Sequence, residues 1–411
     1  MNVLRLYKRA NQRQEENASH AVIIANMNRA VLSLIAVSAF AQTPPPAPVI
    51  SPEVHPDRTV TFRLRAPQAE SVELIGEILQ GKPPLPMTKD ADGVWSVTIG
   101  PLPPEIWLYD FRIGGADLPD PGNISVTPRS PGLVAVSQVE IPGDTPAFYD
   151  ARPVPHGQVH MILYESKAMG VDRYVWVYTP PNYDQTKARY PVYYLLHGNG
   201  ETQNGWMFSG RANIILDNLI ADGKAVPMIV VMPHGHAIQS AMVGPYQAVQ
   251  QPGPPGMLNF TEFTDDLIHQ IIPMVEKDFR TYTDADHRAI GGLSMGAFQS
   301  IQIGLNHLDL FHYVLAYSGG FGGLGPQAPG DIETQAPWKD LLANPEQTKK
   351  NLHLLFLGAG EQETAQPAPG QRLVQLFKEK GINAVWAEYP GGHIFSVWRN
   401  DLNFTAPMLF R

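Results

Sequence analysis

From about residue 155 to residue 411, apolar strand-like runs alternate with segments of helical periodicity, and this alternation constrains the fold more than any other feature. The strand-like runs are RYVWVYTP, YPVYYLLHG, PMIVVMPHG, HRAIGGL, FHYVLAYSGG, LHLLFLGAG and NAVWAEYPGG. Helical spacing between the runs is clearest at Leu267, Ile268, Ile271, Ile272 and Val275, and at Leu373, Leu376 and Phe377 before Gly381. Such alternation builds a doubly wound, mostly parallel sheet with helices on both faces, so residues 155–411 are predicted to form an α/β domain.

The region before the predicted α/β domain has a different sequence pattern. Residues 51–145 hold short segments of alternating polarity, separated by Pro, Gly and Asp: RTVTFRLRAP, SVELIG, GVWSVTIG, IWLYDFRIGG and GLVAVSQVEIP. This pattern predicts a small all-β, immunoglobulin-like sandwich. Its aromatic side chains could stack on sugars or form the sandwich core, and the sequence leaves both interpretations open for Trp95, Trp107, Tyr109 and Phe111.

The N-terminal segment has the layout of a secretory signal. From Met27 the sequence reads MNRAVLSLIAVSAFAQTPPPAP, with a positive Arg29, an apolar run and small residues at the end of the run. We expect a leader over 1–41 cleaved after Ala41, a Pro-rich linker over 42–50, and a secreted or periplasmic protein. An ordinary buried helix is the alternative. The apolar run is shorter than the roughly 20 residues that span a bilayer, so no membrane anchor is expected.

Charge and cysteine content argue against several classes of function. The formal net charge is −9, and removal of residues 1–41, with five Lys or Arg and two Glu, would bring it near −12. A nucleic-acid partner is therefore not expected, because phosphate binding needs clustered cations. The sequence has no cysteine, which excludes disulfides and thiolate metal sites. His234 and His236 could begin a metal site, but no H-E-x-x-H motif or phosphate-binding loop accompanies them, so we expect neither a metal nor a cofactor.

Ligands of such sheets bind beyond the carboxyl ends of the strands, and polar residues gather there in this sequence. One of these strand ends carries Gly292-Leu293-Ser294-Met295-Gly296, a G-x-S-x-G motif between a predicted strand and a predicted helix. In that context the motif forms a sharp elbow that exposes the serine hydroxyl. Ser294 is therefore the candidate nucleophile.

A serine hydroxyl needs a base, and the base needs an orienting acid. His393, flanked by glycines after the last predicted strand, is the candidate base, and Glu361 and Glu363 after the preceding strand are both candidate acids. The oxyanion hole needs two backbone N–H donors, which we assign to Met295 and to Asn199 in the turn HGNGE. The side chain of His197 is expected to pack beneath that turn.

Five motifs in order resemble the carbohydrate esterase family 1 group, also called the esterase D family, over nearly all of residues 155–411. They are YPVYYLLHGNGETQNGW, GRANIILDNLIADGKAVPMIVVMPHGHA, FTDDLIHQIIPMVEKDFRTYTDADHRAIGGLSMG, LHLLFLGAGEQET and YPGGHIFSVWR. The resemblance implies an α/β-hydrolase fold with Ser294 as nucleophile and His393 as base. It favours Glu363 over Glu361, because the acid of the related motif lies three residues after the last glycine of the turn, here Gly360.

The sandwich is similar to the starch-binding-module-like domain that precedes many bacterial feruloyl and acetyl xylan esterases. The resemblance implies an exported serine esterase that removes feruloyl or acetyl groups from plant cell-wall polysaccharide through an acyl-enzyme. Tyr246 in the long 237–259 loop, with Trp206 and Trp398, could line a slot for an aromatic acyl group; the alternative is that both tryptophans belong to the core. A siderophore (enterochelin-type) esterase, an acyltransferase and an inert carbohydrate-binding protein remain alternative functions.

Overall fold

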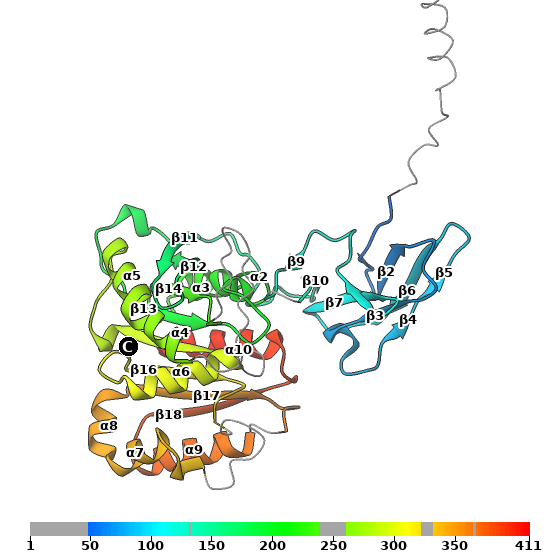
Figure 1. The fold of residues 1–411 in the computed structure, drawn as a ribbon. Coiled ribbons are helices and arrows are strands. Elements are labelled where there is room, and N and C mark those ends of the chain that lie inside the picture. The colour runs from blue at the N-terminus through cyan, green and yellow to red at the C-terminus, as the bar shows by residue number, and fades with distance from the viewer. Residues whose placement is uncertain (1–47, 131–132, 238–259, 322–331, 365–366) are drawn as a thin grey trace, which may run out of the picture. The chain divides into compact units, whose positions relative to one another are not determined.

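The computed structural model describes residues 48–130, 133–237, 260–321, 332–364 and 367–411. The predicted leader and most of the linker lie outside these residues, as does most of the 237–259 loop with Tyr246. Residues 50–411 form one compact unit, which is the part described below (Figure 1). Within the described ranges, no helix is both long enough and apolar enough to cross a membrane.

Two antiparallel sheets form the sandwich. One has the strand order β1-β2-β6-β5, and the other has the order β4-β3-β7-β10-β9 with β8 paired to β7. The strands are β1 (Glu53–Val54), β2 (Val60–Arg65), β3 (Val72–Ile75), β4 (Leu85–Pro86), β5 (Thr88–Lys89), β6 (Val94–Ile99), β7 (Glu105–Ile113), β8 (Ala116–Leu118), β9 (Val126–Thr127) and β10 (Val136–Ile141), with a helical turn η1 (Glu77–Leu79) after β3. The all-β prediction for this region is confirmed.

The aromatic residues of the sandwich form its core. Trp95, Trp107, Tyr109 and Phe111 are at most 8 % exposed and belong to one apolar cluster. The two indole N–H groups are satisfied internally, by the carbonyls of Ala66 and Pro103. Of the two interpretations left open by the sequence, the structure supports the core.

The second part of the chain is built on an eight-stranded sheet of order β11-β12-β14-β13-β15-β16-β17-β18. From β14 to β18 all neighbours pair in parallel, and β11 and β12 extend the sheet in antiparallel register. The strands are β11 (Gln158–Ser166), β12 (Val171–Thr179), β13 (Val192–Leu196), β14 (Ile229–Pro233), β15 (Arg288–Leu293), β16 (Tyr313–Tyr317), β17 (Leu354–Gly360) and β18 (Ala384–Tyr389).

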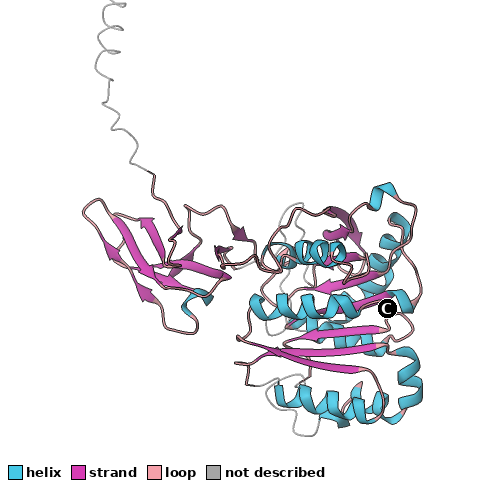
Figure 2. Cartoon of the chain, turned by 180° about the vertical axis from the view of Figure 1, so that it is seen from behind, coloured by secondary structure: helices cyan, strands magenta, loops and turns pink. Residues whose placement is uncertain are grey.

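Helices cover both faces of this sheet, as Figure 2 shows. They are η2 (Tyr183–Gln185), α2 (Gly205–Phe208), α3 (Ala212–Ala221), α4 (Phe260–Asp266), η3 (Leu267–Ile271), α5 (Ile272–Asp278), η4 (Ala285–His287), α6 (Met295–Asn306), η5 (Ile332–Thr334), α7 (Trp338–Ala343), α8 (Pro345–Asn351), α9 (Pro367–Glu379), α10 (Phe395–Thr405) and η6 (Ala406–Met408). The helical periods read from the sequence fall in η3–α5 and in α9, as predicted.

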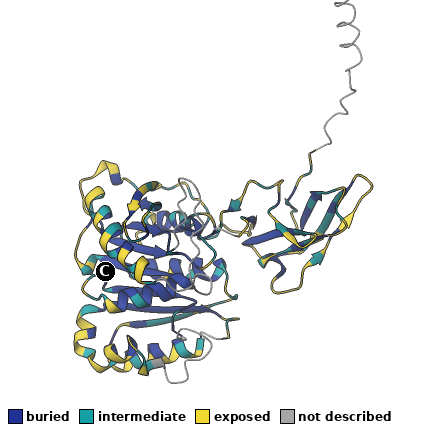
Figure 3. Ribbon diagram, viewed as in Figure 1, coloured by how far each residue is buried: buried dark blue, intermediate teal, exposed yellow. Residues whose placement is uncertain are grey.

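Alternation along each strand divides the core into two layers. In β13, Tyr194 and Leu196 belong to an apolar cluster with residues of α5, α6 and α9, whereas Tyr193 and Leu195 belong to a second cluster with residues of α3 and α10. Side chains on both faces are buried, which explains why the parallel strands are continuous apolar runs. Figure 3 shows these strands as the buried centre of the domain. The mostly parallel, doubly wound sheet is confirmed.

Candidate active site

Ser294 lies at the elbow between β15 and α6, in a strained backbone conformation with φ 54° and ψ −113°. Its N–H donates to the carbonyl of Tyr317 at 2.8 Å, which holds the elbow against β16. Both glycines of the motif are sterically required: a Cβ at Gly292 or Gly296 would lie 2.4 or 2.6 Å from the carbonyl oxygen of Leu196. The sequence thus keeps the space around the elbow free, and Ser294 itself is partly exposed.

The loops after β17 and β18 bring Glu363 and His393 together. Glu363 Oε2 lies 3.2 Å from Nδ1 of His393, and Oε1 accepts hydrogen bonds from Ser318 Oγ at 2.5 Å and Gly360 N at 3.0 Å. Burial would raise the pKa of Glu363, but the hydrogen bonds from His393, Ser318 and Gly360 outweigh it and hold the pKa below its ordinary value. A carboxylate held in this way can orient the imidazole and stabilise its protonated form.

The two loops are packed backbone against backbone. A Cβ at Gly360 would lie 2.4 Å from the carbonyl oxygen of Gly391, and the N–H of Gln362 donates to the same oxygen at 2.9 Å. Glu361, the other candidate acid, is exposed, and within the described part of the chain no hydrogen bond joins its carboxylate to His393. The geometry therefore favours Glu363.

Ser294 lies at the same sheet edge as this pair. Gly319, next to Ser318, approaches the elbow so closely that a Cβ there would be 2.6 Å from the carbonyl oxygen of Ser294. The side chain of His393 is about half exposed, at 48 %. Among the described residues no hydrogen bond joins Ser294 Oγ to His393. The candidate base is therefore hydrogen-bonded to the candidate acid but not to the candidate nucleophile.

The turn after β13 borders the elbow from the other side. A Cβ at Gly198 would lie 3.3 Å from Cβ of Ser294, and Asn199, the next residue, is exposed. Met295 begins α6, so its N–H is one of the unpaired donors of the helix N-terminus. The two N–H groups predicted as oxyanion donors thus belong to segments on either side of Ser294.

The imidazole of His197 supports this turn from beneath, as expected. Its Nδ1 lies 2.8 Å from the carbonyl oxygen of Gly198, and its Nε2 lies 2.9 Å from the N–H of Gly235, which fixes Nδ1 as the protonated nitrogen. Burial lowers the pKa of His197 to about 3, so the ring is neutral. It stacks on His234, whose pKa burial also lowers.

The buried guanidinium of Arg173 lies beside His234 and His236 and donates to both of their carbonyls. Burial first, and then the charge of Arg173, lower the pKa of His236 to about 4. A fixed positive charge at this position opposes a second cation. His234 and His236 are therefore better explained as residues that pack beneath the turn than as metal ligands.

A contact between the sandwich and the HGNGE turn was not predicted. Ser130 donates from its N–H to the carbonyl of Gly200 at 3.0 Å and from Oγ to the carbonyl of Glu201 at 2.5 Å. The carboxylate of Glu201 in turn accepts the N–H of Gly198 at 3.2 Å, and burial raises the pKa of Glu201 to about 7. The contact joins residues about seventy positions apart, and no local sequence signal announces it.

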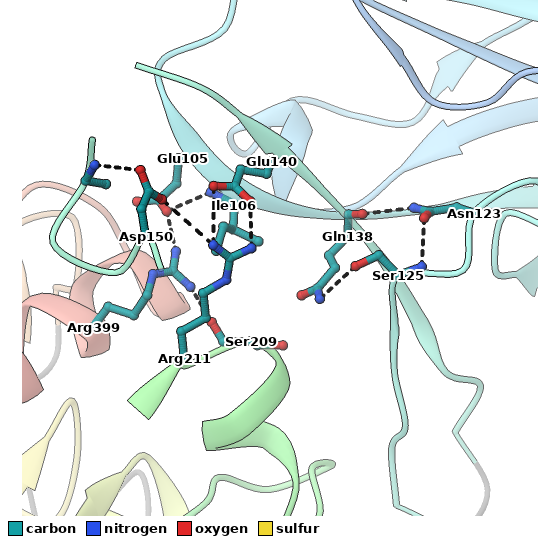
Figure 4. Close-up of polar contacts among 11 residues, drawn as sticks. Glu105, Ile106, Asn123, Ser125, Gln138, Glu140, Asp150, Ser209, Arg211 and Arg399 are labelled. Carbon is teal, nitrogen blue, oxygen red and sulfur yellow. Dashed lines mark hydrogen bonds and ion pairs between the residues drawn. The ribbon is translucent and has the colours of Figure 1, made fainter. Parts of the chain in front are cut away.

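A second contact joins the sandwich to the helix that follows His393. Arg399 of α10 is 1 % exposed and donates to Glu105 of β7 and to the carbonyl of Ser209 (Figure 4). Arg211, just before α3, pairs with Glu140 of β10 at 2.6 Å. The turn after β13, which carries Asn199, and the helix α10, which follows His393, are therefore anchored to the sandwich.

The aromatic slot predicted from the sequence is not formed by the two tryptophans. Trp206 is 1 % exposed and donates its N–H to the carbonyl of Leu196. Trp398 is 4 % exposed, and its ring is perpendicular to that of His393, at 5.0 Å between ring centroids. Both belong to the apolar cluster that contains residues of α10, which supports the alternative that they are part of the core. The prediction that they bind substrate is therefore corrected.

Two family models match the chain. Residues 166–408 match the family described as "Putative esterase", and residues 51–128 match carbohydrate-binding module 48, the isoamylase N-terminal domain. A curated relative, the endo-1,4-beta-xylanase/feruloyl esterase of Xylanibacter ruminicola, is 32 % identical over 369 residues, which cover 88 % of this chain and 46 % of the relative. The chain thus spans about half the length of that relative.

Solved structures share the fold. Enterochelin esterase from Shigella flexneri has a TM-score of 0.61 at 20 % identity, covering 86 % of this chain and 92 % of the other. A ferulic acid esterase of Anaeromyces mucronatus in complex with ferulic acid has a TM-score of 0.50 at 23 % identity, covering 65 % and 96 %. At these identities the likeness concerns the fold, which is the α/β-hydrolase type. Because the first family match spans more than half of the 411 residues, this chain belongs to that esterase family and carries an N-terminal domain of the carbohydrate-binding module 48 type.

Proposed function

We propose that the protein is a secreted serine carboxylesterase that removes feruloyl or acetyl groups from plant cell-wall xylan or its oligosaccharides. The observation that carries the proposal is the strained serine elbow at the same sheet edge as the Glu363–His393 pair. Nothing in this chemistry requires a metal or an organic cofactor, because the serine, the base and the backbone donors together perform acyl transfer.

In the proposed reaction Ser294 Oγ attacks the ester carbonyl while His393 Nε2 takes the hydroxyl proton. The N–H groups of Met295 and Asn199 stabilise the oxyanion. His393 then gives the proton to the departing sugar oxygen, which leaves an acyl-serine and a free alcohol. A water molecule attacks the acyl-serine, His393 takes a proton from it and returns the proton to Ser294, and the carboxylic acid is released. Glu363 orients the imidazole throughout.

The substrate class rests on the relatives. The Xylanibacter ruminicola relative is named as a xylanase and feruloyl esterase, and its similarity covers most of this chain, including the sandwich. Export rests on the signal-like segment from Met27 alone.

The test is release of ferulate and of acetate from feruloylated and acetylated xylo-oligosaccharides by the chain from Gln42 and by its Ser294→Ala variant. Serine-dependent release of ferulate supports the feruloyl branch, and release of acetate alone supports the acetyl branch. Addition of a sugar acceptor separates hydrolysis from acyl transfer. No serine-dependent release of either acid would refute the cell-wall assignment.

One observation favours a second candidate, a siderophore esterase. The fold likeness to enterochelin esterase extends over 86 % of this chain, so it includes at least part of the N-terminal sandwich as well as the catalytic domain. Enterochelin as substrate in the same assay distinguishes the two, since only a siderophore esterase would prefer it to the feruloyl sugar.

A further inference from the structure

Three metal-ligating side chains meet at the sheet edge opposite Ser294. Asp286 precedes β15, His312 precedes β16 and His353 precedes β17, and the three offer ligand atoms that all lie within 4.8 Å of one another. Since β15 is six residues long, its two ends are about 20 Å apart. This cluster is therefore distinct from the proposed active site.

Backbone hydrogen bonds hold the three segments in place. The N–H of His312 donates to the carbonyl of Ala285 at 3.2 Å, and the N–H of His353 donates to the carbonyl of His312 at 2.7 Å. The two imidazoles lie 4.7 Å apart between ring centroids, and the carbonyl of His353 accepts a further bond from Asn383 at 2.6 Å. Because these hydrogen bonds already fix the starts of the strands, the three side chains would lose little conformational entropy on binding an ion.

One of the distances between ligand atoms is close to that of a four-coordinate zinc site. Zinc binds imidazole nitrogen and carboxylate oxygen at about 2.0–2.2 Å, so two ligands of a tetrahedral site are roughly 3.3 Å apart. Asp286 Oδ1 is 3.6 Å from Nε2 of His353 and 2.6 Å from Nδ1 of His312. The second distance is that of a hydrogen bond, and a small rotation of the Asp286 side chain, which is 59 % exposed, would open it to the zinc value.

The donor set also suits this ion. Two imidazoles and one carboxylate are ligands that borderline divalent metals accept, and the exposure of the cluster leaves room for water as a fourth ligand. His312 is 15 % exposed and His353 36 %, so both rings are partly fixed by packing while their edges reach solvent. The net charge of −9 favours the approach of a cation.

We propose that Asp286, His312 and His353 form a zinc site that clips together the amino ends of β15, β16 and β17. The site is structural, because it is a full strand length away from the nucleophile. It supplies a cross-link between three consecutive strands in a chain that has no cysteine to form one.

The test is titration of Zn²⁺ into the chelator-treated full chain by calorimetry, with the melting temperature measured in parallel. We expect His353→Ala and Asp286→Asn each to weaken zinc affinity at least about 100-fold, because each removes a direct ligand. Zinc at about 100 times the parent's Kd should raise the melting temperature of the parent by roughly 3 °C and that of either variant by less than about 1 °C.

The matched control is His269→Ala. His269 forms an exposed pair with Asp265 at 2.8 Å, as His312 does with Asp286, but among the described residues no third metal-ligating side chain completes a cluster with that pair. This variant should bind zinc like the parent. The proposal is overturned if His353→Ala binds zinc as tightly as the parent, or if His269→Ala loses as much affinity. Asp286→Asn keeps the proposal testable should His353→Ala fold poorly.

Discussion

The buried ion pair between Arg399 and Glu105 allows a quantitative test of how the sandwich supports the catalytic domain. The side chains are 1 % and 14 % exposed, and the guanidinium also donates to Ser209 and lies 4.9 Å from the ring centroid of Tyr149. Replacing Arg399 by Met removes the cation, keeps most of the volume and leaves the Glu105 carboxylate without its partner.

Removal of one member of a buried pair costs about 3–5 kcal/mol, because the remaining charge is left uncompensated. Glu105 still accepts a hydrogen bond from the N–H of Ile106 at 2.7 Å and keeps some contact with solvent. The loss of stability should therefore lie near the lower end of this range. We therefore expect Arg399→Met to reduce the free energy of unfolding by about 3 kcal/mol. In the double variant with Glu105→Gln no charge is left buried, so at least about 1 kcal/mol of the loss should be recovered.

The assay is guanidinium denaturation followed by tryptophan fluorescence, with Arg211→Met as the matched control. Arg211 also joins the sandwich through a carboxylate, that of Glu140, but these side chains are 26 % and 39 % exposed, so its loss should cost below about 1 kcal/mol. Equal effects of the two arginine substitutions, or a double variant no more stable than Arg399→Met, would refute the reasoning.

Three further predictions concern single side chains. Glu363→Gln should lower kcat roughly 10³- to 10⁴-fold, since the neutral amide no longer fixes the imidazole, whereas Glu361→Gln should leave kcat unchanged; steady-state hydrolysis of a small ester measures both. Asp401 is fully buried with no hydrogen bond to its carboxylate among the described residues, and burial raises its pKa well above 3.8. A raised pKa costs stability that grows as the pH rises above the unfolded value, so Asp401→Asn should raise the melting temperature at pH 8 and change it little near pH 4; an equal change at both would contradict this. Ser130→Ala should lower kcat up to about tenfold by loosening the HGNGE turn, whereas Ser125→Ala, elsewhere on the sandwich, should not.

Much of the fold follows from patterns within short windows of sequence. Parallel strands such as β13 are buried on both faces and are therefore continuous apolar runs. The serine elbow is recognisable because the nearby backbone leaves no room for a side chain at Gly292 or Gly296. The edge strand β11 was not predicted. Its side chains Val159, Met161 and Leu163 point outward and are 39–60 % exposed, so the strand lacks the buried apolar pattern that identified the others.

The candidate site residues could be predicted from the ends of the strands, whereas the tertiary contacts around them could not. The sequence alone left Glu361 and Glu363 open as acids, and only the resemblance to the esterase family ranked Glu363 first; in the structure Glu363 lies against His393. Burial of Trp206 could not be read from its neighbours in sequence, because it depends on distant residues of the same cluster, among them Phe395 of α10. The link from Ser130 to the HGNGE turn likewise depends on how distant segments meet.

That link, together with the Arg399 pair, bears on where the chain can be cut. A truncated form that begins near residue 155, or at the start of the family match at 166, would retain the candidate nucleophile, base and acid. It would also leave the Arg399 guanidinium without Glu105 and the turn at Gly200 without Ser130. The shortest stable and active fragment is therefore expected to start near residue 50, so that expression boundaries follow the contacts made by the folded chain and not the ends of the esterase homology.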